Sequence, residues 1–69
     1  MRYAVVIEKS GSGYSAYVPD LAGCVATGRT RPTVIRRIRE AIALHIQGMR
    51  DDGLRVPRPR TRAEYIDAA

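Results

Sequence analysis

The stretch YSAYVPDLAGCVATG, residues 14–28, holds two strand-like runs separated by a short elbow. Pro19 cannot donate a backbone hydrogen bond to a sheet, so the first run is predicted to end just before it. Asp20 can accept hydrogen bonds from neighbouring backbone, and Gly23 can take the positive φ that reverses the chain. The stretch therefore predicts two antiparallel strands joined by a rigid turn, with Gly28 closing the second strand.

The preceding run RYAVVIE, residues 2–8, carries apolar side chains at both odd and even positions. A strand that is apolar on both faces is typical of the middle of a sheet, so this run is predicted to be a central strand. The polar segment KSGSG, residues 9–13, supplies turn chemistry and joins it to the next strand as a hairpin.

A long amphipathic helix is predicted after the third strand. Thr30 is suited to the N-cap and Pro32 to the first turn, where the missing N–H of proline costs little. Gly53 is suited to the left-handed position that follows the last turn. Apolar residues at helical spacing form one stripe that can pack on the sheet. This stripe consists of Val34, Ile35, Ile38, Ala41, Ile42, His45, Ile46 and Met49.

The C-terminal part divides into a connector and a short apolar run. The connector, residues 53–63, contains Pro57, Pro59 and four arginines, and is predicted to be extended. Residues 64–69 are predicted to form a fourth strand that returns beside the first through a right-handed crossover.

These elements predict one α+β domain of the order β-β-β-α-β over residues 1–69. Its parts are a three-stranded antiparallel meander, one helix packed on the sheet and a short closing strand. The sheet and helix core spans residues 1–52, and no C-terminal DNA-binding domain is expected.

Length and composition exclude several classes of protein. A 69-residue chain buries only about 60% of the surface that it exposes when unfolded, so its core is small. A single cysteine excludes an intrachain disulfide, and no Cys–His cluster can hold a structural zinc. A homodimer or higher homo-oligomer is the remaining way to protect the core, and is expected. Without a membrane-length apolar run or a signal peptide, the chain is expected in the cytoplasm with no membrane partner.

The excess of basic residues leaves nucleic-acid binding open as a function. Twelve Lys and Arg residues outnumber seven acids, giving a net charge of +5. Such a chain can bind RNA or DNA through phosphate contacts that depend strongly on salt, or simply have a well solvated surface. The arginines that would carry nucleic-acid binding are Arg36, Arg37 and Arg39 on the helix and Arg58 and Arg60 in the connector.

The succession YSAYVPDLAGCVATGRT, REAIALHIQGMRDDG and VPRP resembles the HicB-like antitoxin family of type II toxin–antitoxin systems, over about residues 1–62. The matching positions are Tyr14, Pro19, Asp20, Gly23, Cys24, Gly28, Glu40, Ala41, Gly53, Pro57 and Pro59. The resemblance implies a partial RNase H-like domain that binds and occludes a small ribonuclease toxin of the HicA type. The resemblance is also compatible with an orphan antitoxin-like protein whose toxin has been lost.

A toxin that approaches RNA is expected to be basic, so acidic positions are candidates for its binding. The elbow is a second candidate, because a rigid turn loses little entropy on docking. The candidate partner-binding residues are Asp20 and Leu21 in the elbow and Glu64, Tyr65 and Asp67 in the last run.

No catalytic residue, metal or cofactor is expected. Metal-dependent cleavage in an RNase H-like fold needs clustered carboxylates, one of them in the first strand, where this chain has Val5 and Val6. Cys24 and His45 offer a thiol and a base, but each falls in an apolar pattern and is predicted to pack in the core or an interface. The chain is therefore expected not to be an enzyme.

Overall fold

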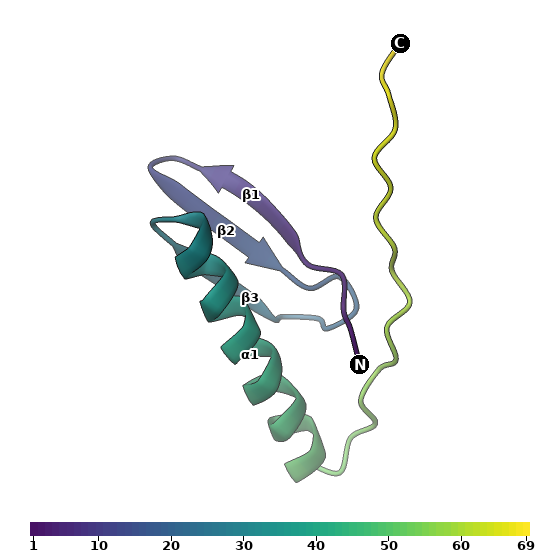
Figure 1. Cartoon of the computed structure of the whole chain (residues 1–69). Coiled ribbons are helices and arrows are strands. Elements are labelled where there is room, and N and C mark those ends of the chain that lie inside the picture. The colour runs from purple at the N-terminus through teal and green to yellow at the C-terminus, as the bar shows by residue number, and fades with distance from the viewer.

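The computed structural model describes residues 1–69 as three antiparallel strands with one long helix across one face (Figure 1). The strands are β1 (Val6–Ser10), β2 (Gly13–Tyr17) and β3 (Val25–Gly28), in the spatial order β1-β2-β3. The helix α1 (Arg31–Asp51) follows β3 directly. The α+β class, the meander and the helix are confirmed.

The turns form where the sequence predicted them. In the β1–β2 hairpin Ser10 is opposite Gly13, which leaves a two-residue turn whose first residue, Gly11, has a φ of 56°. Gly at this position is typical of tight hairpin turns. The elbow is closed by backbone hydrogen bonds from Val18 to the Cys24 carbonyl and from Cys24 to the Leu21 carbonyl.

Both ends of α1 carry the predicted caps. The Thr30 hydroxyl accepts a hydrogen bond from the Thr33 N–H at 3.2 Å and so satisfies one of the unpaired amides of the first turn. At the other end Gly53 has a φ of 70°, and the N–H of Leu54 donates to the Met49 carbonyl at 2.8 Å. This is a Schellman motif, which turns the chain sharply into the connector.

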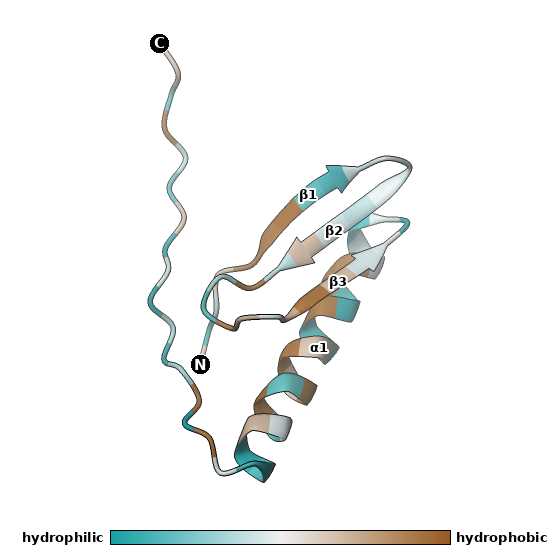
Figure 2. Cartoon of the chain, turned by 180° about the vertical axis from the view of Figure 1, so that it is seen from behind, coloured by the Kyte–Doolittle hydropathy of each residue, from teal (hydrophilic) through white to brown (hydrophobic).

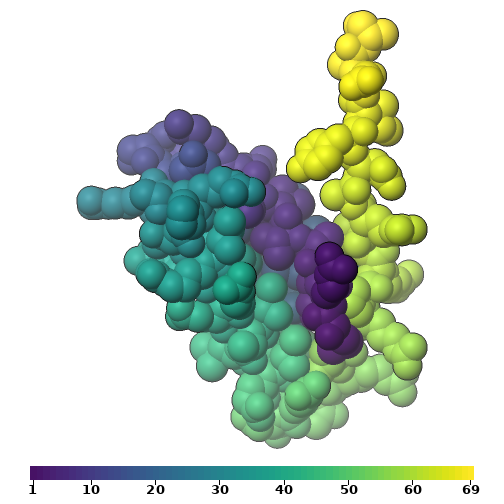
Figure 3. All heavy atoms as spheres, viewed as in Figure 1, coloured from purple at the N-terminus to yellow at the C-terminus, as the bar shows by residue number.

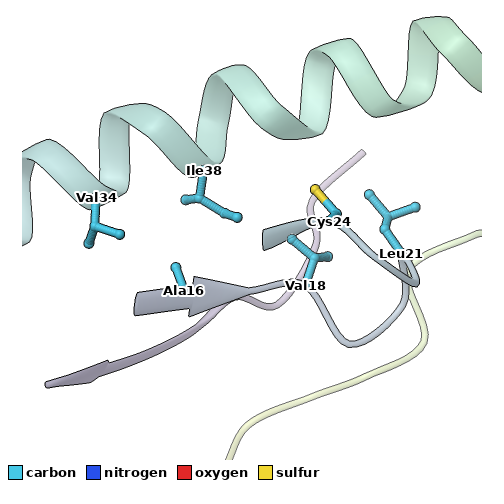
Figure 4. Close-up of a cluster of buried hydrophobic side chains, with 6 residues drawn as sticks. All are labelled: Ala16, Val18, Leu21, Cys24, Val34 and Ile38. Carbon is cyan, nitrogen blue, oxygen red and sulfur yellow. The ribbon is translucent and has the colours of Figure 1, made fainter. Parts of the chain in front are cut away.

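The core lies between α1 and the strands β2 and β3. Six side chains are buried there, and Figure 4 shows those of the sheet side and the elbow pointing at the helix. They are Ala16, Val18, Leu21, Cys24, Val34 and Ile38. The predicted helical stripe supplies half-buried neighbours such as Ile42 and Ile46, so the stripe is confirmed as the sheet-facing side.

Two predictions about the sheet were wrong. The first strand lies at an edge rather than in the middle, and its regular part begins at Val6 because residues 2–5 have no neighbouring strand to pair with. The predicted fourth strand at residues 64–69 is absent. That run is short and rich in alanine and acids, and all of its residues are exposed. Neither side-chain packing nor backbone pairing with the sheet holds it in place. No helix has the length and apolar character that a membrane span requires.

Candidate functional site

The elbow holds the connector through one carboxylate. Asp20 accepts hydrogen bonds from the backbone N–H of Arg60 at 2.7 Å and of Thr61 at 2.9 Å. The Thr61 hydroxyl donates to the other carboxylate oxygen at 2.7 Å. These three bonds join segments 40 residues apart in the sequence, and we call them the Asp20 anchor.

A second contact fixes the start of the connector. The Tyr3 hydroxyl donates a hydrogen bond to the Pro57 carbonyl. Pro57 and Leu54 also border an apolar hollow of about 360 Å³ against His45 and Met49 of α1. The connector is thus tied to the N-terminal segment, to the helix end and to the elbow before it reaches residue 62.

The anchor lowers the pKa of Asp20 below its ordinary value of 3.8. The main cause is the hydrogen bond from the Arg60 N–H, followed by those from the Thr61 hydroxyl and N–H, all of which favour the charged carboxylate. A carboxyl whose pKa is lowered by folding stabilises the fold above its unfolded pKa. That contribution is lost as the pH falls through the lower, folded value.

Asp20→Ala is expected to release the connector without unfolding the domain, because the three bonds lie at the surface. The Arg60–Thr61 peptide bond, whose N–H the carboxylate holds, should then be cut by trypsin several times faster. Mass spectrometry of timed digests measures this rate. Asp52→Ala removes the same charge from an exposed side chain that makes no hydrogen bond to residues 60 and 61, and should leave the rate unchanged. Equal rates in both variants would contradict the anchor.

The pKa of Asp20 leads to a separate expectation for pH. Amide signals of Arg60 and Thr61 in NMR spectra should keep their positions from neutral pH down past pH 3.8. They should shift only at more acidic pH, when the carboxyl becomes protonated. A transition at or above the ordinary value would show that the bonds do not form in solution.

Residues 64–69, which we call the arm, project beyond the anchor. Every residue of the arm is exposed, and Tyr65 and Ile66 have 101% and 86% of their surface accessible. Figure 3 shows this end of the chain standing clear of the domain. The arm holds Glu64 and Asp67 and no basic residue, so its charge is −2, whereas residues 1–63 carry +7 and the whole chain +5. An acidic arm with two large apolar side chains therefore extends from a basic domain.

The structure separates the candidate partner-binding residues into three roles. The Asp20 carboxylate already accepts the three hydrogen bonds of the anchor. Leu21 is only 1% exposed and belongs to the core of the folded domain, so it offers a partner little surface, and its role in partner binding stays a prediction. Glu64, Tyr65 and Asp67 lie together on the arm, where a partner can reach them.

The candidate nucleic-acid residues are not gathered into one patch. Arg36 lies 3.7 Å from Glu40, and Arg37 donates to the Thr27 carbonyl at 3.0 Å. Arg58 and Arg60 are in the connector, which lies apart from the first half of α1 in both ribbon views (Figures 1 and 2). No observation therefore favours nucleic-acid binding over binding of a protein partner.

Cys24 and His45 border the same small hollow beside α1. Burial raises the pKa of the Cys24 thiol, whereas a nucleophilic cysteine needs a lowered one. Nowhere do three His, Cys, Asp or Glu side chains come together as a metal ion would need.

Two exposed apolar residues, Val25 and Leu44, were not among the candidate residues predicted from the sequence. Leu44 could have been found, because it is a leucine on the polar side of the predicted helix.

A family model described as HicB-like antitoxin of bacterial toxin–antitoxin system matches residues 3–69. The chain belongs to this HicB-like antitoxin family. Curated relatives include a 14.9 kDa protein from the rep–hol intergenic region of Haemophilus phage HP1, 37% identical over 97% of this chain and 50% of the relative. The chain thus spans about half the length of that phage protein. A UPF0150 protein of Thermoplasma acidophilum is 36% identical over 99% of this chain and 100% of its own length.

A solved structure supports the same family assignment. It is described as the HicA3 and HicB3 toxin–antitoxin complex, and it matches with a TM-score of 0.74 and 32% sequence identity. The match covers 86% of this HicB-like chain and 70% of the solved chain. The resemblance found in the elbow and helix therefore extends to the three-dimensional fold.

Proposed function

We propose that this chain is the toxin-binding module of an antitoxin, which binds a small ribonuclease toxin of the HicA kind and inhibits it by occlusion. The observation that carries the proposal is the fold match to a protein described in complex with such a partner, at 32% identity. Inhibition of this kind needs no catalytic residue, so the module itself is not an enzyme. Its place of action is the cytoplasm, where the RNA substrate of such a toxin lies.

The arm is the surface that best fits a basic toxin. Glu64 and Asp67 supply negative charge that is complementary to an RNA-binding protein, while Tyr65 and Ile66 supply apolar contact area. The Asp20 anchor holds the root of the arm, so fewer backbone conformations are lost when it binds. Anchor and arm together form a partly preorganised docking element.

The direct test starts with a tagged chain recovered from lysate of its own host, with and without ribonuclease treatment. A small basic protein retained at equal stoichiometry in both samples is the expected partner. The purified partner should then cleave RNA, and one equivalent of this chain should stop the cleavage. A retained protein whose activity on RNA is unaffected by the chain would refute the proposal, as would retention of nucleic acid alone.

Glu64→Lys with Asp67→Lys is expected to weaken toxin binding at least about tenfold, because attraction to a basic surface becomes repulsion. Isothermal titration calorimetry with the purified toxin measures the change. Asp51→Lys with Asp52→Lys is the matched control, since it makes the same change of charge at the exposed end of α1. If both pairs weaken binding equally, net charge is responsible and the arm is not the contact.

A further inference from the structure

A polar hollow of about 280 Å³ lies at the hairpin end of the sheet, between the β1–β2 turn and the start of α1. Figure 1 shows this turn, the end of β3 and the first turn of the helix at the same end of the domain. Only one of the residues that border the hollow, Tyr14, is hydrophobic, and none is acidic. Figure 2 colours this end of the hairpin white to teal, in contrast to the brown starts of β1 and β3. The hollow is therefore suited to a polar ligand that is not positively charged.

Four hydroxyl side chains border the hollow. Ser10 and Ser12 belong to the hairpin end, Ser15 to β2 and Thr27 to β3. The backbone that carries them is fixed by the sheet, because Ser10 is paired with Gly13 and Ser15 with Thr27. Each hydroxyl can donate one hydrogen bond to an anionic oxygen. An anion bound here would meet donors that the fold already holds close together.

Two arginines without an acidic partner border the same hollow, Arg29 just before α1 and Arg37 in its second turn. The one ion pair of the chain joins Arg36 to Glu40 and involves neither of them. The Arg37 guanidinium donates a hydrogen bond to the Thr27 carbonyl at 3.0 Å, which holds it beside the sheet and leaves its other N–H groups available. The planar guanidinium fork matches the oxygens of a phosphate group, so the arginines favour phosphate over other anions.

The balance of charge favours a terminal phosphate over a phosphate within a nucleic-acid backbone. A phosphomonoester carries about −1.5 to −2 at neutral pH, which two arginines balance, whereas each backbone phosphodiester carries one negative charge. The ammonium group of Lys9 lies 5.9 Å from the centre of the Tyr14 ring and adds a third cation near the hollow. The only acid in the three strands, Glu8, is paired with Ser15 but does not border the hollow.

The size of the hollow limits how much of a ligand it can enclose. Pockets that enclose a drug-sized ligand measure about 300–1,000 Å³, and this hollow falls just below that range. It can therefore hold a phosphate group and the atoms next to it, while the rest of the ligand stays in solvent.

We propose that this hollow binds a terminal phosphate, the dianion of a phosphomonoester. Arg29 and Arg37 neutralise its charge, and the serine and threonine hydroxyls donate hydrogen bonds to its oxygens. The site is independent of the toxin-binding proposal, because it lies at the hairpin end of β2, whereas the Asp20 anchor and the arm lie beyond the elbow at the other end of that strand. The two proposals can therefore fail separately.

Adenosine 5′-monophosphate is the probe, and amide NMR spectra of the whole chain provide the measurement. The amide signals of residues at the hollow, such as Ser12, Gly13 and Gly28, should shift until they saturate, and adenosine without a phosphate should leave them in place. Arg29→Gln with Arg37→Gln should weaken binding at least about tenfold, because charge-assisted hydrogen bonds are lost. The absence of saturable shifts in the wild type would overturn the proposal.

Two further variants separate the site from general charge and from loss of folding. Arg36→Gln with Arg39→Gln removes the same charge from exposed side chains of α1 that do not border the hollow, and should leave binding unchanged. Arg29→Gln alone keeps the hydrogen bond from Arg37 to the sheet, so it should keep the wild-type circular dichroism spectrum and still bind several-fold more weakly. Equal weakening by both double variants, or wild-type affinity in Arg29→Gln, would overturn the proposal.

Ligands that differ only in their phosphate test the monoester and identify its source. Cyclic adenosine monophosphate is a diester with one negative charge and should bind several-fold more weakly than the 5′-monophosphate. A short RNA with a 5′ phosphate should bind through the same amides, and the same RNA with a 5′ hydroxyl should not. Much tighter binding of the phosphorylated RNA than of the mononucleotide would support an RNA end as the ligand, and equal binding of the two would support a free mononucleotide. Equal binding of the two RNAs, or of the cyclic and linear nucleotides, would overturn the proposal.

Discussion

Leu21→Ala is expected to remove most of the stability of this domain, at a cost of about 2–5 kcal/mol. Leu21 is 1% exposed and is one of the two largest fully buried side chains. Its removal leaves a cavity where the elbow packs against α1, and the backbone hydrogen bonds of the elbow prevent the chain from collapsing into it. Domains of this size rarely have more than about 3–5 kcal/mol to lose.

Urea unfolding followed by far-UV circular dichroism measures this cost. The midpoint for Leu21→Ala should fall by about 1 M or more, given the usual urea dependence of small domains. Leu44→Ala is the matched control: it deletes the same atoms from a side chain that is 76% exposed, and should change stability by no more than about 0.5 kcal/mol. If Leu21→Ala kept the stability of the wild type and lost only partner binding, Leu21 would be a docking residue and its assignment to the core would be wrong.

Gly28→Ala is expected to destabilise the domain by about 1–3 kcal/mol. A Cβ at this position would lie 2.8 Å from the backbone nitrogen of Val34 and 3.1 Å from its Cα. Both atoms belong to the first turn of α1, which is capped by Thr30 and packed on the sheet, so neither can move aside cheaply. Glycine at the end of β3 is what allows the helix to start so close to the strand.

Thermal unfolding provides the measurement for this second prediction. Gly28→Ala should lower the melting temperature by several degrees, since about 1 kcal/mol corresponds to roughly 4–8 °C in a domain of this size. Gly48→Ala is the control with the opposite expected sign. Gly48 lies inside α1 with open space around its missing side chain, so alanine there should stabilise the helix by about 0.5–1 kcal/mol. Equal shifts in both variants would show that the close approach of β3 and α1 is not what limits position 28.

Local patterns of sequence were sufficient wherever the cause of the structure was itself local. Pro19 and Gly23 define the elbow because one lacks an N–H and the other takes a φ of 82°. Thr30 and Gly53 mark the ends of α1 because their caps involve residues only a few positions away. The apolar stripe likewise predicted which side of the helix meets the sheet.

The candidate site was harder to predict, because its main contact joins distant segments. Asp20 was correctly recognised as a hydrogen-bond acceptor in a turn, but its partners are at positions 60 and 61 rather than in the elbow. The acids and aromatic ring of the arm could be selected from composition alone. Their complete exposure could not, because a short run of mixed polarity is equally compatible with a strand and with an extended tail.

The sequence by itself determined the order of the three strands and the helix, the turns, the caps and the family, since each depends on backbone preferences and spacing within a few residues. Only the tertiary structure decided that β1 lies at an edge, that Leu21 is buried and that the connector is held by Asp20. Edge position and burial depend on which segments are present to cover a surface, and no local pattern records that. The same reason explains why β1 has the composition of a central strand while one of its edges is open.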